Sequence, residues 1–228
     1  MISALAACAD APIQRKDGSY SKREFSVARM AKGDIDEVVE AHQRAMLASL
    51  KALALKFYKR NPREYRKDGH ATPEAAVARL FEPLTNWEQA TERLLDWESR
   101  LRDAWRADYA GDRVAALMQG LVRMGMASYG DRTEFYMLSQ VDPQKLYNSA
   151  RNIEAVAWKV ANARDSAGEL VLVSNSMVPG QDQNLSFERE FGKLIATQDT
   201  LALIIEDKSS RVIRTGVVNV ASMLFLPI

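Results

Sequence analysis

The chain has one cysteine, Cys8, and only two histidines, His42 and His70, among its 228 residues. A single cysteine has no partner for an intrachain disulfide, which excludes a disulfide-stapled fold. It also excludes the paired-cysteine motifs of zinc and redox sites, and two isolated histidines do not make a zinc site. The sequence therefore predicts neither a bound metal nor a cofactor.

The chain also lacks a long apolar run and an excess of charge of either sign. The longest apolar stretch, residues 217–228, is interrupted by polar residues and proline and falls short of the ~20 residues that cross a membrane. Lysine and arginine total 31 against 30 aspartates and glutamates, so the net charge is +1. Because nucleic-acid binders depend on a surplus of basic residues, no nucleic-acid partner is expected.

Familiar catalytic motifs are missing as well. The chain contains no P-loop, no GxGxxG fingerprint and no HExxH pair. Gly125 and Gly130 lie on either side of Ser128, but their spacing does not fit the GxSxG nucleophile elbow. Gly120 and Gly125 are predicted instead to be points of close packing between helices, and no catalytic residue is predicted.

Four residues near the start of the sequence, Leu5-Ala6-Ala7-Cys8, resemble the lipobox of bacterial lipoproteins. In that family a leucine and two small residues precede a cysteine that carries diacylglycerol, and stable anchoring needs more than one acyl chain. A secretory signal has a basic segment and ~7–15 apolar residues before this point, and only seven residues precede Cys8. The resemblance implies a signal that begins upstream, lipid attachment at Cys8, and a periplasmic body anchored to the outer membrane.

A polar tether is predicted over residues 9–23, followed by one α+β domain over residues 24–228. Its first part, to about residue 165, is predicted to be helical, because apolar residues recur there every three or four positions. A short helix is expected after Thr72-Pro73. Four long helices with short connections indicate a bundle, and their predicted ranges are 34–61, 86–105, 112–130 and 142–164.

After Gly168 the apolar spacing changes, and the chain is predicted to form mainly β structure over residues 168–228. Short runs rich in β-branched and aliphatic residues, separated by turn residues, are typical of strands. Residues 187–195 are expected to be helical, with Ser186 as the cap. The predicted strands, which would form a small antiparallel sheet against the helical bundle, are 169–174, 201–206, 211–215, 223–226 and, at the N-terminal side, 24–29.

The strongest local bias in composition lies between residues 55 and 70, where basic residues alternate with aromatic ones. Only Glu64 and Asp68 oppose them. Such a segment would attract an anionic polymer, lipid headgroups or an acidic protein. The alternative is that the cations gather at a helix C-terminus because the helix dipole favours them there. The candidate anion-binding residues are Lys56, Tyr58, Lys59, Arg60, Arg63, Tyr65, Arg66 and Lys67.

A second candidate site is a polar pocket between helices, formed by His42, Tyr147 and Arg151. The alternative for His42 is a histidine at the edge of the core, bonded to a neighbouring group. The expected function is that of a non-catalytic cell-envelope lipoprotein that binds a protein or polymer partner. A small-molecule receptor or enzyme is the rival, and convergence of His42 and Arg151 in a deep pocket would favour it.

Overall fold

The computed structural model describes residues 33–136, 141–175, 185–209 and 225–228. Within these ranges the chain forms seven α-helices, two short 3-10 helices and no β-strand. The predicted α+β class is therefore wrong for the part of the chain that is described. In order, the elements are α2 (Asp34–Arg60), α3 (Pro62–Lys67), α4 (Pro73–Phe81), η1 (Glu82–Gln89), η2 (Thr91–Leu94), α5 (Trp97–Asp103), α6 (Arg113–Ser128), α7 (Pro143–Asn162) and α8 (Ser186–Ser209).

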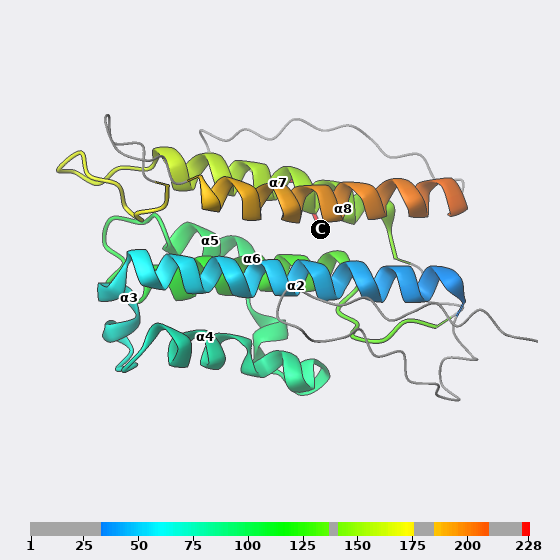
Figure 1. Cartoon of the computed structure of the whole chain (residues 1–228), viewed down its shortest axis with the longest axis horizontal. Coiled ribbons are helices and arrows are strands. Elements are labelled where there is room, and N and C mark those ends of the chain that lie inside the picture. The colour runs from blue at the N-terminus through cyan, green and yellow to red at the C-terminus, as the bar shows by residue number, and fades with distance from the viewer. Residues whose placement is uncertain (1–32, 137–140, 176–184, 210–224) are drawn as a thin grey trace, which may run out of the picture.

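The four longest helices, α2, α6, α7 and α8, form the body of the molecule. Helices α7 and α8 lie side by side, and α2 packs on α8 to form the next layer (Figure 1). Helix α6 contacts α2, α5 and α7, while α3 and α4 lie on the far side of α2 from α8. No helix among the described residues combines the length and the hydropathy of a membrane span.

Four of the described α-helices begin directly after a threonine or an aspartate that acts as the N-cap. At the N-caps of α4, α5, α6 and α7 a side-chain oxygen accepts a backbone N–H of the first turn, which satisfies a donor that the helix itself leaves unpaired. Prolines then occupy the first turn of α3, α4 and α7. The predicted starts of α4, α6 and α7 are confirmed, and the capping residues are Thr72, Asp96, Asp112 and Asp142.

The predicted helix over residues 86–105 is broken into three pieces. Ala90 and Leu95 adopt extended backbone conformations, with ψ near 133° and 137°. Asp96 then starts α5 afresh, because its carboxylate accepts the N–H of Glu98 and the hydroxyl of Ser99. The apolar spacing of this region continues through the breaks, so periodicity alone does not reveal them.

The predicted strand over residues 201–206 is the last part of α8. Its apolar residues continue the helical stripe begun by Phe187, Phe191 and Leu194, and Leu201 and Ile205 are buried along the same helix. A short apolar run fits a strand or a buried helix equally well, and helical packing on α7 and α2 decided the outcome here. The predicted helix at 187–195 is confirmed and extends to Ser209.

The predicted strands 169–174 and 223–226 do not form within the described residues, which leave out 223 and 224; Leu170 makes one isolated antiparallel bridge, with Arg164. Asn61 donates to the carbonyl oxygen of Val173 and accepts its N–H, at 2.9 and 2.8 Å. Asn152 does the same for Leu226, at 2.9 and 2.7 Å. A carboxamide offers the same donor and acceptor as a peptide group, so these asparagines replace a neighbouring strand. The predicted strands at 24–29 and 211–215 lie outside the described residues.

Close approach at two glycines confirms the predicted packing points on α6. A Cβ built on Gly120 would lie 2.6 Å from Leu101 Cδ2 and 3.1 Å from the Leu101 backbone nitrogen. One on Gly125 would lie 2.8 Å from Met46 Sδ. These glycines let α5 and α2 approach α6 closely.

Candidate functional site

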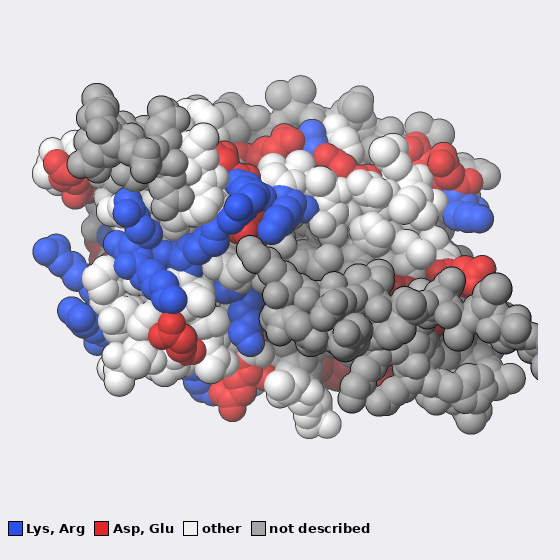
Figure 2. Space-filling view, in the orientation of Figure 1, with Lys and Arg blue, Asp and Glu red and all other residues white. Residues whose placement is uncertain are grey.

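The basic residues of the 55–70 segment gather on one face of the molecule, over the C-terminal end of α2 and over α3 (Figure 2). Helix α8 packs along α2 and adds Arg189 and Lys193 to the same region. We call these residues the basic face: Lys56, Lys59, Arg60, Arg63, Arg66, Lys67, Arg189 and Lys193. The two α8 residues could not be found from local composition, because they follow the 55–70 segment by more than a hundred positions.

The lysines of the basic face are held by carboxylates. Lys59 lies 3.2 Å from Glu74 of α4, and Lys67 lies 2.8 Å from Glu64. Lys56 and Lys193 both approach the buried carboxylate of Glu190, at 3.6 and 3.2 Å. These lysines therefore contribute less net positive charge than their number indicates.

Three arginines of the basic face have no ion-pair partner among the described residues. Arg60, Arg63 and Arg66 are all exposed. Arg63 and Arg66 are three positions apart on α3, so their side chains lie on the same side of that helix. The Arg66 guanidinium lies 5.6 Å from the centre of the Tyr65 ring, within range of a cation–π contact. These three arginines, at the corner where α2 meets α3, are therefore the cations of the basic face that no described carboxylate balances.

Both tyrosines of the candidate segment lie beneath the basic face. Tyr58 and Tyr65 are 1% and 7% exposed, and their rings meet edge to face at 5.9 Å. The Tyr58 hydroxyl donates to Asp112 Oδ2 at 2.8 Å. Burial, with the nearby Asp112 carboxylate, raises the pKa of Tyr58 above its ordinary range, and burial likewise raises the pKa of Asp112. The Tyr58–Asp112 hydrogen bond joins α2 to the start of α6, and the contact between the two tyrosine rings joins α2 to α3. These contacts hold the helices that carry the three arginines.

The residues of the predicted polar pocket have separate partners. His42 Nδ1 lies 2.8 Å from the carbonyl oxygen of Val38 on its own helix. Arg151 lies over the Tyr147 ring, 5.0 Å from its centre, and pairs with Asp199 and Glu154. Tyr147 and Arg151 thus come together, while the bond that His42 makes is local to α2. Arg151 joins α7 to α8 and has its charge balanced by two carboxylates.

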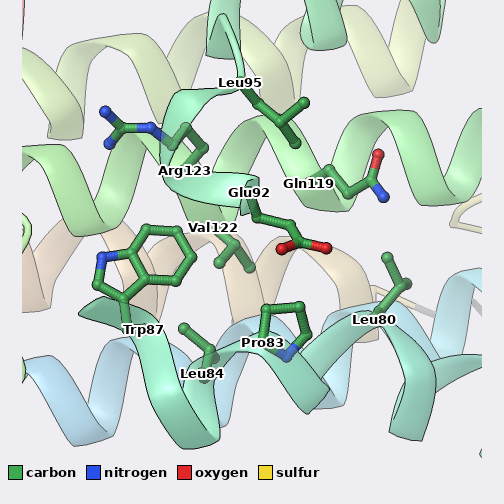
Figure 3. Close-up of a pocket in the computed structure, with 9 residues that line it drawn as sticks. All are labelled: Leu80, Pro83, Leu84, Trp87, Glu92, Leu95, Gln119, Val122 and Arg123. Atoms are coloured by element: carbon green, nitrogen blue, oxygen red, sulfur yellow. The ribbon is translucent and has the colours of Figure 1, made fainter. Parts of the chain in front are cut away.

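A narrow cleft lies where η1 and η2 meet α6, with an empty volume of about 270 Å³ that includes its open mouth. Figure 3 shows that the Trp87 ring nitrogen and the Arg123 guanidinium point away from the middle of the cleft. Arg123 pairs with Asp131 at 2.7 Å. The cleft is mostly apolar, and its lining residues are Leu80, Pro83, Leu84, Trp87, Glu92, Leu95, Gln119, Val122 and Arg123.

A buried polar contact joins three helices without forming a catalytic arrangement. Gln198 of α8 donates to the hydroxyls of Ser128 and Ser149, at 3.1 and 3.0 Å. Ser128 in turn donates to the Gly125 carbonyl oxygen at 2.7 Å. A serine nucleophile needs a base within hydrogen-bond reach, and among the described residues the hydroxyls of Ser128 and Ser149 bond only to the Gln198 amide and the Gly125 carbonyl. We therefore read the cluster as a structural link between α6, α7 and α8.

Comparisons with known proteins give no match: no protein-family model, no curated protein and no solved structure resembles the chain. Among the described residues no group of three or more histidine, cysteine, aspartate or glutamate side chains is placed to hold a metal ion. The lipid-attachment residue Cys8 lies outside the described residues and stays a prediction. The basic face is therefore the described feature that bears most directly on function.

Proposed function

We propose that this chain is a non-catalytic cell-envelope lipoprotein that binds an anionic polymer through the basic face. The observation that carries the proposal is the set of three exposed arginines, Arg60, Arg63 and Arg66, that lack an ion-pair partner among the described residues. Arginine presents a planar fork of donors that fits carboxylate and phosphate groups. The membrane anchor is the one implied by the lipobox-like residues that end at Cys8.

The arrangement of the arginines favours a polymer over a small anion. They lie on an exposed corner formed by α2 and α3. They line neither the cleft beside α6 nor the open hollow between α2 and α4, whose lining residues are Ala48, Lys51, Ala52, Leu55, Glu74 and Val77. A small anion bound in the open would be exposed to water and salt, which weaken a single ion pair. A polymer with repeated charges engages several arginines at once, and each later contact is intramolecular.

The contacts beneath Arg60, Arg63 and Arg66 favour an anion-binding site that is already formed before the ligand binds. Tyr58 and Tyr65 bury their rings beneath it, and Lys67 donates to the carbonyl oxygen of Gly111 at 3.0 Å, which ties α3 to the start of α6. Glu64 Oε2 accepts the backbone N–H of Arg113 at 2.7 Å. Helices held in this way present their arginines with little rearrangement, which preserves binding free energy.

The test compares two triple variants of the full chain with the wild type. In the first, Arg60, Arg63 and Arg66 are changed to glutamine. In the matched control the same charge is removed from exposed arginines that have acidic partners, Arg79, Arg102 and Arg106. Binding is measured by fluorescence anisotropy with end-labelled long-chain polyphosphate and with poly-L-glutamate, at low and at physiological salt.

The first variant is expected to bind at least about tenfold more weakly, since one basic residue near an anionic surface contributes on the order of 1 kcal/mol. The control is expected to change affinity by less than about twofold. Wild-type binding should also fall steeply between low and physiological salt, because the screening length shortens from ~30 Å at ~0.01 M to ~8 Å at ~0.15 M. Equal losses in both variants, or no binding by the wild type, would contradict the proposal.

The proposed localisation in the cell envelope has a separate test. The intact mass of the protein expressed from its own gene should show a diacylglycerol-modified Cys8 as the first residue. An unmodified Cys8 would contradict the proposed envelope localisation. It would not affect the proposed anion binding, which the arginine variants test.

A further inference from the structure

Glu190 of α8 is a buried carboxylate that holds three cations of the basic face. Its side chain is 6% exposed, and the ammonium of Lys56, from α2, lies 3.6 Å from it. Lys193 and Arg189, from α8 itself, lie 3.2 and 3.7 Å from it. A carboxylate removed from water needs such partners, because an unpaired buried charge is strongly unfavourable. We call Lys56, Arg189 and Lys193 the Glu190 cluster, which lies where α8 packs on α2.

The Glu190 cluster retains positive charge and hydrogen-bond donors that Glu190 does not use. Three cations against one carboxylate leave a net charge of +2. Glu188, the acidic residue just before Arg189, accepts instead from the Asn175 amide at 2.8 Å. An ammonium has three donors and a guanidinium five, whereas a carboxylate has roughly four acceptor sites. Donors of the cluster therefore remain for a second anion.

The cations of the Glu190 cluster reach the surface. The side chains of Arg189 and Lys193 are 67% and 55% exposed, and they lie one turn apart on the same side of α8. Lys56 is 25% exposed and also donates to the carbonyl oxygen of Ser186 at 3.1 Å. Glu190 and Ser186 thus fix the cations from the protein side. A site arranged in this way before binding loses less free energy to ordering than flexible surface lysines do.

The Glu190 cluster adjoins the corner formed by Arg60, Arg63 and Arg66. Lys56 and Arg60 are four positions apart on α2, so they lie on the same side of the helix with a rise of ~6 Å between them. Figure 2 shows the lysine and arginine side chains of this face as a largely connected group rather than as scattered single charges. A chain of anionic groups bound at the corner would therefore meet the Glu190 cluster within about one helical turn.

We propose that the Glu190 cluster is a second anion subsite, and that the ligand of the basic face is a long polyanion that spans both subsites. The proposal rests on the proposed function, because the corner of Arg60, Arg63 and Arg66 is the first subsite. A short anion occupies one subsite at a time. A long chain held at the corner presents its next charges to the Glu190 cluster at a high effective concentration, so affinity increases with chain length.

The test variant is Arg189→Gln with Lys193→Gln in the full chain. It removes two cations of the second subsite and keeps Lys56 as a partner for the buried Glu190 carboxylate. The matched control is Arg44→Gln with Lys208→Gln, which removes the same charge from exposed positions on α2 and α8 outside the basic face. The variant with Arg60, Arg63 and Arg66 changed to glutamine reports on the first subsite.

The probes are long-chain polyphosphate and tripolyphosphate, titrated by calorimetry at low salt. Each basic residue near an anionic chain contributes about fivefold in affinity, so Arg189→Gln with Lys193→Gln should bind the long chain at least about tenfold more weakly. Its affinity for tripolyphosphate should stay within about twofold of the wild type, because the corner is intact. The control should bind both probes within about twofold of the wild type, and the corner variant should bind both more weakly.

Thermal unfolding of each variant checks that the fold is retained. If the double variant is unfolded, Lys193→Gln alone leaves two cations beside Glu190 and should lose about fivefold for the long chain. Unchanged long-chain binding in the α8 variants, together with a loss in the corner variant, would overturn the second subsite and leave the proposed function intact. Equal losses for the two probes in the α8 variants would also overturn it, since chain length would then not matter. A wild type that binds no long chain would contradict the proposed function itself.

Discussion

The α5 region and the α2–α3 corner are both rich in arginine, yet their charges are in opposite situations. Around α5, Arg102 lies 3.2 Å from Glu98, and Arg106 lies 2.9 Å from Asp103 and 2.7 Å from Asp108. At the corner, Arg60 and Arg63 have no such partner in the described part of the chain. Acidic residues three or four positions away on the same helix neutralise a cation. The number of arginines therefore indicates a binding surface less well than the placement of the carboxylates around them.

The largest expected effect concerns the support beneath the corner. Tyr58→Phe removes the hydroxyl that donates to the buried Asp112 carboxylate, and hydrogen bonds to charged groups contribute about 1.5–3 kcal/mol. We expect the free energy of unfolding to fall by about 2 kcal/mol, measured by urea denaturation.

Tyr129→Phe is the matched control for this change. Tyr129 is equally buried, but its hydroxyl has no hydrogen-bond partner among the described residues. Its loss should leave stability unchanged or slightly increased. Equal losses in the two variants would show that the contact with Asp112 does not support the corner.

The difference in stability between the wild type and Tyr58→Phe should depend on pH. The pKa of Tyr58 is raised in the folded state, so above the ordinary tyrosine pKa of about 10 the unfolded chain loses this proton and the folded chain keeps it. The stabilising contribution of Tyr58 is therefore present below pH ~10 and declines above it. The stability difference between wild type and Tyr58→Phe should narrow in that range, and a constant difference would contradict the assignment.

An intermediate effect is expected where α5 meets α6. Gly120→Ala places a Cβ against Leu101, and overpacking of this kind costs about 1–3 kcal/mol, partly offset by the higher helix propensity of alanine. A net loss of about 1–2 kcal/mol is expected in thermal unfolding. Gly192→Ala on α8 meets no atom within 4 Å and should stabilise by about 0.5–1 kcal/mol. Polyphosphate binding should be the same in both variants, and a loss of binding in Gly120→Ala would mean that α5 contributes to the anion site.

The smallest effect tests the comparison most directly. Glu98→Gln with Asp108→Asn removes acidic partners of Arg102 and Arg106 and raises the local net charge by two. Exposed ion pairs contribute little to stability, so unfolding should be unchanged within error. Polyphosphate affinity should rise about threefold because the local net charge rises by two, although Arg106 keeps Asp103 and Arg102 keeps Asp96 as partners. An unchanged affinity would show that added net charge alone does not create a binding surface.

Helices with a continuous apolar stripe and a local cap were predictable. The stripe and caps of α6 and α7 are read from residues three or four positions apart, which is the range over which helices are stabilised. The prediction failed where a distant group decided the conformation. Val173 and Leu226 have their peptide groups paired with Asn61 and Asn152, which are 112 and 74 positions away. A β-rich composition predicts an extended segment, but it does not say what will satisfy the backbone of that segment.

The basic face was likewise predictable from the sequence only in part. By itself the sequence determined that cations concentrate between residues 55 and 70, because composition is a local property. Only the tertiary structure decided which of them are unpaired: Glu74 and Glu190 reached Lys59 and Lys56 from other helices, and no described carboxylate reached Arg60 or Arg63. The tertiary structure also buried Tyr58 and Tyr65, since their rings stabilise the molecule more against the core than in water. Pairing and burial depend on residues brought together by folding, whereas charge density depends only on neighbours along the chain.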